Sequence, residues 1–206
     1  MPMNRKKFVI ICGGDCHTDG ISTETVENSF VIAADSGYNT AVLLNITPDL
    51  LVGDMDSIGN VPENIETVKV KPEKDDTDTM LAIDIALSRG AEEIIIIGGG
   101  GGRADHLLSN VFMLEALSDK GIRAELHDGI NRMFVLQNGK ATLKQNGGYF
   151  GLLALENSTV TATGCKYPLH SAPLTRTHPY AVSNEIAGNE AEVTVQGKII
   201  VTQSKK

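Results

Sequence analysis

The stretch from Ile94 to His106, IIIIGGGGGRADH, joins four consecutive isoleucines to five consecutive glycines and then to an arginine and an aspartate. The isoleucine run is short, continuously apolar and followed by glycine, as is typical of buried strands in parallel sheets. The segment 107–120 then repeats leucine and valine at helical spacing and stops at Gly121. The stretch therefore predicts a buried strand, a glycine loop and a helix in succession.

Two earlier apolar runs, Phe8 to Cys12 and Phe30 to Ala34, have the same character, and each stops next to glycine or aspartate. A second helix is predicted over Thr79 to Ser88, behind the capping-type residues Asp76 and Thr77. Strands that alternate with helices predict a doubly wound, mostly parallel α/β sheet. We expect this α/β domain to span residues 1–128.

Beyond about Gly129 the chain changes to short alternating segments separated by turn dipeptides. These dipeptides are Asn138-Gly139, Gly147-Gly148 and Gln196-Gly197. Alternation on both sides of the last dipeptide predicts a hairpin whose arms share a buried face, formed by Val193, Val195, Ile199 and Val201. We expect a small, all-β, sandwich-like domain over residues 129–206.

The composition is that of a folded globular protein, with 41% hydrophobic and 21% charged residues among 206. Its 18 basic and 26 acidic residues leave a net charge of −8 without a long basic cluster, so we expect no binding to nucleic acid. No segment approaches the roughly 18 apolar residues of a membrane span, and the first apolar run is too short for a signal peptide. We therefore expect a cytoplasmic protein that does not bind membranes.

Cysteine and histidine do not form a recognisable metal or redox motif. Cys12 and Cys16 have three residues between them rather than the two of common zinc and redox pairs, and Cys165 makes the count odd. The five histidines lack the HxxxH and HExxH spacings. We interpret the cysteines as structural thiols and expect no zinc site.

Aspartates recur where the predicted strands end. Asp35 follows the run 30–34, Asp54 and Asp56 lie in GDMDS behind the run 50–52, and Asp105 lies in the loop after 94–97. Because the carboxyl ends of parallel strands meet at one edge of a sheet, we expect these carboxylates to converge. Carboxylates without histidine or cysteine suit Mg²⁺, which takes one or two of them together with phosphate oxygens. By themselves, Asp54 and Asp56 fit a solvated turn equally well.

The acidic segment 74–78, KDDTD, directly precedes the second predicted helix. Acidic residues in a first helical turn often serve only to match the helix dipole, and this structural interpretation stays open. In the functional interpretation Asp78 points at the same metal ion, while Thr77 or backbone N–H groups bind phosphate oxygens.

The glycine loop 98–102 is neither a P-loop, because no GK[ST] ends it, nor a GxGxxG motif, because Arg103 replaces the third glycine. A plain glycine loop still lets backbone N–H groups approach phosphates closely, and we assign this role to Gly101 and Gly102. Arg103 offers a bidentate clamp and Asp105 a further carboxylate. A purely structural turn needs only one or two glycines. We interpret His106 as a packing or hydrogen-bonding residue rather than an acid or base.

The motifs AADSG, GDMDS, KDDTD and GGRADH, followed by Asn110, together resemble the thiamine pyrophosphokinase family. GCKYPL at 164–169 and VSNE at 182–185 continue the resemblance, which covers residues 8–201. The resemblance implies an enzyme that moves the pyrophosphoryl group of ATP onto the hydroxyl of thiamine, giving thiamine pyrophosphate and AMP. It also implies a homodimer, with thiamine between the two domain types across the subunit boundary.

The same resemblance implies roles for single residues. Mg²⁺ would be held by Asp54, Asp56 and Asp78. The residues around the ATP phosphates and thiamine would be Asp35, Thr77, Arg103 and Asp105, with Asp35 or Asp105 orienting the thiamine hydroxyl or taking its proton. Ser183 and Asn184 would contact the thiamine ring.

Two features depart from the family pattern. Leu81 stands where relatives often carry a lysine, and the chain has no tryptophan to stack on thiamine, which leaves His178 and Tyr180 as candidates.

Two other functions use the same residues: a magnesium-dependent nucleotide phosphohydrolase and a nucleotide-binding module without catalysis. The hydrolase predicts phosphate release without thiamine, and the module predicts no turnover.

Overall fold

The computed structural model of the chain describes residues 6–58, 63–69 and 77–206. Asp75 and Asp76 of the predicted acidic segment 74–78 lie outside these ranges. The chain divides into two compact units, Met1–Gly129 and Ile130–Lys206. Within the described ranges, no helix combines the length and the apolarity that crossing a membrane requires.

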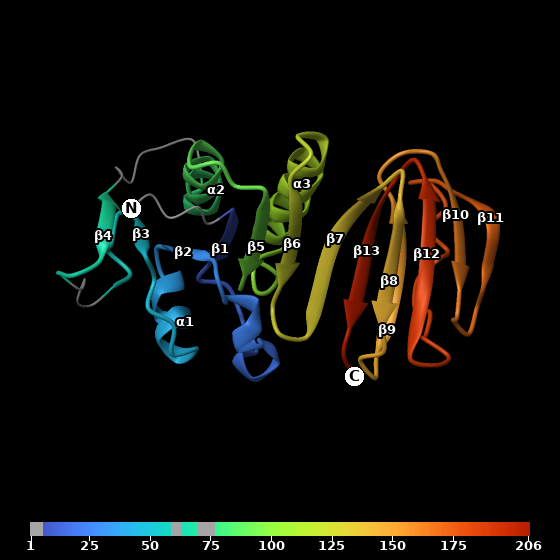
Figure 1. Cartoon of the computed structure of the whole chain (residues 1–206), viewed down its shortest axis with the longest axis horizontal. Helices are drawn as coiled ribbons and strands as arrows, with labels where there is room; N and C mark the ends of the chain where they lie inside the picture. The colour runs from blue at the N-terminus through green and yellow to red at the C-terminus, as the bar shows by residue number, and fades with distance from the viewer. Residues whose placement is uncertain (1–5, 59–62, 70–76) are drawn as a thin grey trace. The chain divides into compact units, whose positions relative to one another are not determined.

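The first unit is built on a parallel sheet (Figure 1). Its strands are β1 (Lys7–Ile11), β2 (Phe30–Ala34), β3 (Leu50–Gly53), β4 (Glu66–Lys69), β5 (Glu93–Ile97) and β6 (Arg123–His127). They lie in the order β4-β3-β2-β1-β5-β6, and every neighbouring pair is parallel. The predicted α/β class is confirmed, and the three predicted apolar runs form β1, β2 and β5.

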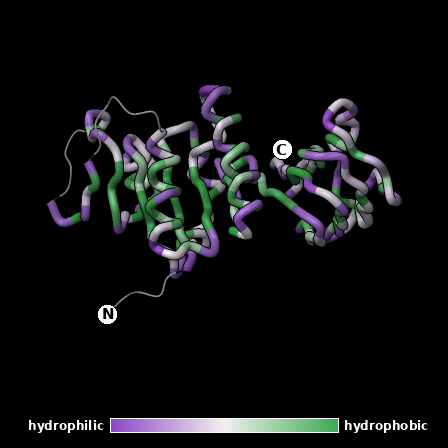
Figure 2. Tube along the Cα trace, turned by 90° about the horizontal axis from the view of Figure 1, so that it is seen from above, coloured by the Kyte–Doolittle hydropathy of each residue, from purple (hydrophilic) through white to green (hydrophobic). Residues whose placement is uncertain are grey.

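Helices cover the sheet because its central strands are continuously apolar and buried. Figure 2 shows green, hydrophobic stretches along the trace of the first unit. They are α1 (Gly37–Leu43), α2 (Asp78–Ser88) and α3 (Ala104–Asp119), with short 3-10 turns at Thr18–Gly20 and Thr23–Thr25. Val9 and Ile11 of β1 pack with Ala41 of α1. α2 contacts β1, β2 and β3, and α3 contacts β6. This burial of continuous apolar runs supplies the core of the unit.

The predicted position of Asp105 was wrong in one respect. It does not lie in a loop, because α3 begins at Ala104, three residues earlier than the apolar pattern indicates, with Arg103 as its N-cap. An acidic residue in the first turn of a helix interacts favourably with the helix dipole, and alanine is a strong helix former. Both residues therefore extend the helix toward the glycine loop.

The strand order places a topological switch point at β1, which lies between β2 and β5. The chain runs outward from β1 to β4 and then returns to the other side of β1 with β5 and β6. At such a point the loops behind neighbouring strands turn away from one another, which leaves a crevice at the carboxyl ends of the strands. The ends of β1 and β5 are therefore where a ligand is expected.

The second unit is an antiparallel β-sandwich. Its strands are β7 (Asn131–Gln137), β8 (Lys140–Lys144), β9 (Tyr149–Ala154), β10 (Ser158–Thr163), β11 (Leu169–Leu174), β12 (Glu190–Gln196) and β13 (Lys198–Ser204). β13 pairs with β7 and β9, and a four-stranded sheet runs in the order β11-β10-β12-β8. Inward side chains of both layers form one apolar core. The predicted sandwich-like class is confirmed.

The hairpin predicted around Gln196-Gly197 was wrong, although its shared buried face was right. β12 pairs with β10 and β8, whereas β13 pairs with β7 and β9, so the turn carries the chain from one layer to the other. Gly197 has a φ of 107° and its N–H donates to Asn138 Oδ1 over 2.8 Å. Asn138 N donates in return to Gly197 O over 2.9 Å. The turn at Asn138 also connects the two layers, since β7 and β8 belong to different sheets. These two turns are thus joined by hydrogen bonds.

Candidate active site

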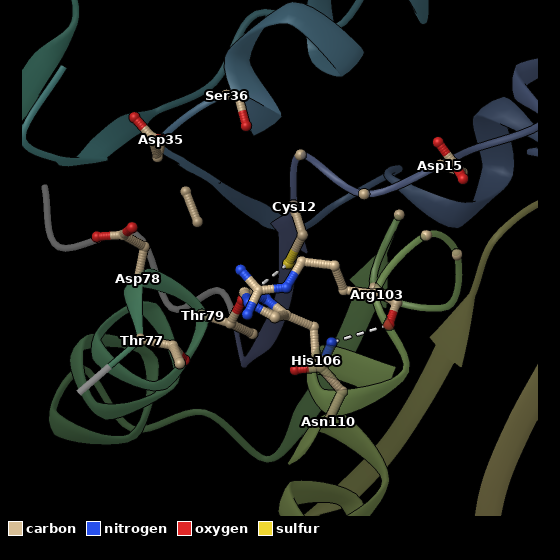
Figure 3. A pocket seen from close by; sticks show the side chains of 17 residues that line it. Cys12, Asp15, Asp35, Ser36, Thr77, Asp78, Thr79, Arg103, His106 and Asn110 are labelled. Carbon is tan, nitrogen blue, oxygen red and sulfur yellow. Dashed lines mark hydrogen bonds between the residues drawn. The ribbon is translucent and has the colours of Figure 1, made fainter. Parts of the chain in front are cut away.

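A pocket of about 410 Å³ opens in the first unit at the carboxyl ends of β1, β2 and β5 (Figure 3). This volume lies in the range of small-molecule sites. The walls come from the segments behind these three strands and from the start of α2. The lining residues are Cys12 to Asp15, Ala34 to Ser36, Thr77 to Thr79, Gly98, Gly99, Gly101 to Arg103, His106 and Asn110. The pocket therefore occupies the crevice at the switch point.

Asp35, Asp54 and Asp56 form a compact group, with one carboxylate oxygen of each within 4.8 Å of the others. The turn between β3 and the next segment brings two of them together. Met55, in a left-handed conformation with φ of 69°, is buried in an apolar cluster with Leu51, so its two neighbours point out of the core. Asp56 N donates to Asp54 Oδ1 over 3.1 Å and fixes the turn.

Asp35 occupies an unusual position at the end of β2. Its φ is 47°, a conformation that few residues other than glycine adopt, and Asp35 N donates to Val52 O over 2.7 Å. Among the described residues, Asp35 Oδ1 is a buried side-chain oxygen without a hydrogen-bond partner. A buried carboxylate oxygen without a donor is costly, and a cation beside it removes that cost.

This donor set fits a hard divalent cation, because it consists of carboxylate oxygens without nitrogen or sulfur ligands. The structure thus brings together three of the four carboxylates expected behind the strands, Asp35, Asp54 and Asp56, without Asp105. Asp78, which the family resemblance assigned to the metal, is not a member of this group. Asp78 is half-buried in the first turn of α2 and lines the pocket. The charge of three close carboxylates makes this corner of the first unit strongly negative.

Two glycine segments that line the pocket pack directly against each other. A Cβ placed on Gly14 would lie 2.4 Å from Gly98 O, so only glycine allows this approach. Gly98 has a φ of 73°, and its N–H donates to His127 O over 3.0 Å, which extends the β5–β6 pairing into the loop. Gly101 and Gly102 line the pocket, in agreement with their predicted position.

Arg103 and Asp105 form a two-point ion pair at the start of α3. Arg103 Nε donates to Asp105 Oδ1 over 3.1 Å, and Nη2 donates to Oδ2 over 2.5 Å. The hydrogen bond from Arg103 holds the pKa of Asp105 below its usual value. Figure 3 shows the Arg103 side chain extending into the pocket, whereas Asp105 is not part of its lining. Both side chains are mostly exposed, so the pair is weak enough to be exchanged for a ligand.

The start of α2 is fixed by two contacts. Thr77 Oγ1 accepts a hydrogen bond from Met80 N over 3.2 Å, which confirms Thr77 as the cap of the helix. Thr79 Oγ1 lies 3.3 Å from Cys12 Sγ at the end of β1. The first turn of α2, with Asp78, is therefore held against the sheet.

The sequence interpretation missed several lining residues. They are Cys12, Gly13, Gly14, Asp15, Ser36, Thr79 and Asn110, and His106, interpreted as a packing residue, also lines the pocket. Gly13, Gly14 and Asp15 carry the same signal as Asp35, since they directly follow an apolar strand. Asn110 was named only as part of the family motif, without a role, because it comes to the pocket through the packing of α3.

Cys12 lines the pocket, but its surroundings disfavour the reactive thiolate form. Burial raises the pKa of its thiol from 9.0 to about 11, with the Thr79 hydroxyl acting in the opposite direction. The thiol is therefore neutral at physiological pH, and only the thiolate is reactive. All three cysteines are free thiols.

The raised pKa of Cys12 predicts a stability effect at alkaline pH. Between pH 9 and about 11 the unfolded chain releases this proton and the folded chain retains it. The contribution is thus complete below pH 9 and decreases as the pH rises toward 11. From pH 8 to pH 10 we expect the free energy of unfolding to fall by about 1 kcal/mol more in the wild type than in Cys12→Ala, measured by urea denaturation. Equal losses in both proteins would contradict the assignment.

In the second unit, Ser183 and Asn184 differ in their surroundings. Ser183 is exposed with a φ of 58°. Asn184 is buried, its Nδ2 donates to Tyr167 O over 2.7 Å, and its Oδ1 accepts from Tyr167 N over 3.1 Å. Asn184 thus fixes the segment of Tyr167. The rings of His178 and Tyr180 lie 5.0 Å apart, and Tyr180 donates to Pro173 O over 3.0 Å.

Comparisons with known proteins find two family models along the chain. One, described as "Thiamin pyrophosphokinase, catalytic domain", matches residues 22–126. The other, "Thiamin pyrophosphokinase, vitamin B1 binding domain", matches residues 140–200. The thiamine pyrophosphokinase of Bacillus subtilis is 31% identical over 193 residues, which cover 88% of this chain and 90% of that relative.

Solved structures give the same result. The crystal structure of the Bacillus subtilis thiamine pyrophosphokinase has a TM-score of 0.86 at 28% identity and covers 98% of this chain and 100% of its own. A thiamin pyrophosphokinase family protein from Enterococcus faecalis has a TM-score of 0.78 at 27% identity, with 98% and 99% covered. The thiamin pyrophosphokinase of Candida albicans has a TM-score of 0.80 at 14% identity and covers 100% of this chain and 90% of its own. At this identity the similarity supports the fold alone.

Proposed function

The chain belongs to the thiamine pyrophosphokinase family, and we propose on this basis that the pocket of the first unit binds ATP for pyrophosphoryl transfer. The chain is accordingly an enzyme that moves the pyrophosphoryl group of ATP to the hydroxyl of thiamine and leaves AMP. The observation that carries this assignment is that one pocket is lined by a glycine loop, Arg103 and Asp35, and that Asp35 is grouped with two further carboxylates, Asp54 and Asp56. The first unit thus provides the ATP and metal site, and the second unit contributes to thiamine binding.

The metal of this site is Mg²⁺ in our proposal, held by Asp35, Asp54 and Asp56 with Asp78 as a further ligand. The unpaired Asp35 Oδ1 and the all-carboxylate donor set support this choice. When bound, the ion neutralises charge on the phosphate oxygens of ATP. The three carboxylates also repel one another without a cation, which favours its uptake.

The remaining residues align the reactants and balance their charge. Backbone N–H groups of the glycine loop bind phosphate oxygens, together with the amino-terminal end of α2. Arg103 leaves Asp105 and clamps the transferred group, because a phosphate offers the same two-point geometry with more charge. Until ATP binds, Asp105 holds the Arg103 guanidinium in place, and in this proposal it does not act on the thiamine hydroxyl. Transfer of this kind needs alignment and charge neutralisation more than covalent help from the protein.

We propose a homodimer as the active form, with the active site shared between subunits. Leu108 and Phe112, one turn apart on α3, expose 54% and 61% of their surfaces and thus offer an apolar face for such contact. Activity should then fall on dilution in parallel with the dimer fraction in sedimentation. A fully active monomer would contradict the shared site.

The function is tested by measuring AMP formed from ATP. We expect AMP only when ATP, thiamine and Mg²⁺ are all present, with thiamine pyrophosphate formed in equal amount. EDTA should abolish both products, and added Mg²⁺ should restore them. AMP or phosphate release that does not depend on thiamine would favour a phosphohydrolase, and the absence of turnover would favour a binding module. Either result overturns the assignment.

A further inference from the structure

An asparagine is buried in the middle of α3. Asn110 is only 6% exposed, although asparagine is a poor helix former and a buried amide is costly without hydrogen bonds. The helix itself gives no reason for a polar residue here. The reason lies in the glycine loop, since Asn110 Nδ2 donates to Gly99 O over 2.9 Å in a buried hydrogen bond.

The glycine loop rests directly on this side chain. A Cβ on Gly99 would lie 2.8 Å from Asn110 Nδ2 and 3.0 Å from Ile96 Cγ2. A Cβ on Gly100 would lie 2.6 Å from Asp128 Oδ2. Asn110, Ile96 and Asp128 therefore support the loop from the side of the sheet and α3, and Figure 3 shows the Asn110 hydrogen bond on that side.

The orientation of the Gly99 peptide matters for an anionic ligand. A glycine peptide turns over easily because no Cβ restricts it. In one orientation its carbonyl oxygen would face a phosphate and repel it, whereas N–H groups attract a phosphate. We propose that Asn110 is a positioning residue: its amide holds the Gly99 carbonyl toward α3, so that the loop presents N–H groups to the phosphates of ATP. This inference rests on the proposed ATP site.

Two substitutions of Asn110 test the role of its amide. Asn110→Leu keeps the approximate size and removes the donor, which leaves the Gly99 carbonyl unpaired. Asn110→Asp keeps the shape but places an acceptor oxygen against that carbonyl. We expect the Kd and KM for ATP to rise by about five- to thirtyfold in Asn110→Leu and further in Asn110→Asp. The KM for thiamine should change less than twofold. The fold-change in kcat at saturating ATP should be smaller than the fold-change in the KM for ATP, because the amide acts on ATP binding.

The matched control is Leu117→Ala on the same helix. Leu117 is 1% exposed and does not line the pocket, so its truncation destabilises the fold without touching the glycine loop. ATP binding is measured by calorimetry and the Tm by thermal denaturation, on the full chain. The inference predicts that Leu117→Ala lowers the Tm but keeps the Kd for ATP.

Each outcome decides one question. If the wild type does not bind ATP, the proposed function of the pocket fails, and the inference fails with it. If the wild type binds ATP and both Asn110 variants bind it within twofold of the wild type, only the positioning role is overturned. A rise in Kd that Leu117→Ala reproduces at an equal loss of Tm would assign the effect to stability and would also overturn the role.

Discussion

Replacement of Asp35 by asparagine is expected to lower the rate of AMP formation by about a thousandfold and to raise the Tm of the metal-free protein. Asparagine has the shape of aspartate and tolerates the left-handed backbone of this position, where φ is 47°. The fold should therefore persist. What is lost is the charge of a carboxylate whose Oδ1 is buried without a partner, next to two further carboxylates.

The expected rise in Tm follows from the crowding of the three acids. Two charges 4.8 Å apart repel by about 3 kcal/mol at an effective dielectric of 20, and by under about 1 kcal/mol in water. Asp54 is half-buried and Asp56 is exposed, so the relief is closer to the lower figure. About 1 kcal/mol corresponds to a rise of about 2–4 °C for a protein of this size. The three carboxylates thus lower the stability of the metal-free protein, and their expected role in metal binding explains why they are there.

The control for this prediction is Asp84→Asn. Asp84 is exposed on α2, in the same unit and outside the pocket lining, so its replacement should change neither activity nor Tm. Asp54→Asn should behave like Asp35→Asn in both measurements. Near-normal AMP formation in Asp35→Asn and Asp54→Asn together would refute the metal site.

The parts of the fold that were predictable are those encoded by adjacent residues. β2 has the predicted bounds, 30–34, because a strand buried on both faces must be continuously apolar. Thr77 is the predicted cap of α2, because capping depends on a hydroxyl within the same turn. Both signals are local, so they can be read without knowledge of the rest of the fold.

The pairing of β12 and β13 was not predictable in this way. Alternation tells which side chains are buried, and Val193 and Ile199 do share one core. It does not tell which strand lies beside which. Here the crossover at Gly197 is stabilised by Asn138, which is 59 residues away, and such a contact leaves no trace in the local pattern.

The same difference between local signals and contacts of distant residues applies to the site. The rule that ligands bind behind parallel strands placed Asp35 and Asp54 at one edge, and the structure brings them within 4.8 Å. The same rule included Asp105, which lies in α3 and outside this group. The close packing of Gly53 on Asp35, where a Cβ on Gly53 would lie 3.1 Å from Asp35 Cα, was not predictable from the local pattern. Asn110 was named in the family motif, but its contact with Gly99, eleven residues earlier, was not predicted.

Arg103→Ala is expected to reduce kcat/KM for ATP by about a hundred- to a thousandfold, the usual effect of removing a donor that stabilises a transition state. Arg103 lines the pocket at the start of α3, next to the glycine loop. Arg103→Lys keeps the charge but not the two-point geometry, so it should recover only part of this loss. Stability should not change, because the Arg103–Asp105 pair is exposed at 72% and 64% of its side chains.

Two further variants separate the charge of Arg103 from its orientation. Asp105→Asn weakens the pairing that holds the guanidinium, and we expect a loss of kcat/KM of less than about tenfold, since Arg103 itself remains. Arg123→Ala removes an arginine that is 81% exposed and paired with Glu93, and it should leave the kinetics unchanged. If Arg103→Ala stays within threefold of the wild type while Asp105→Asn does not, the carboxylate and not the guanidinium acts on the substrate. Steady-state AMP formation by the wild type and the four variants, Arg103→Ala, Arg103→Lys, Asp105→Asn and Arg123→Ala, distinguishes these cases.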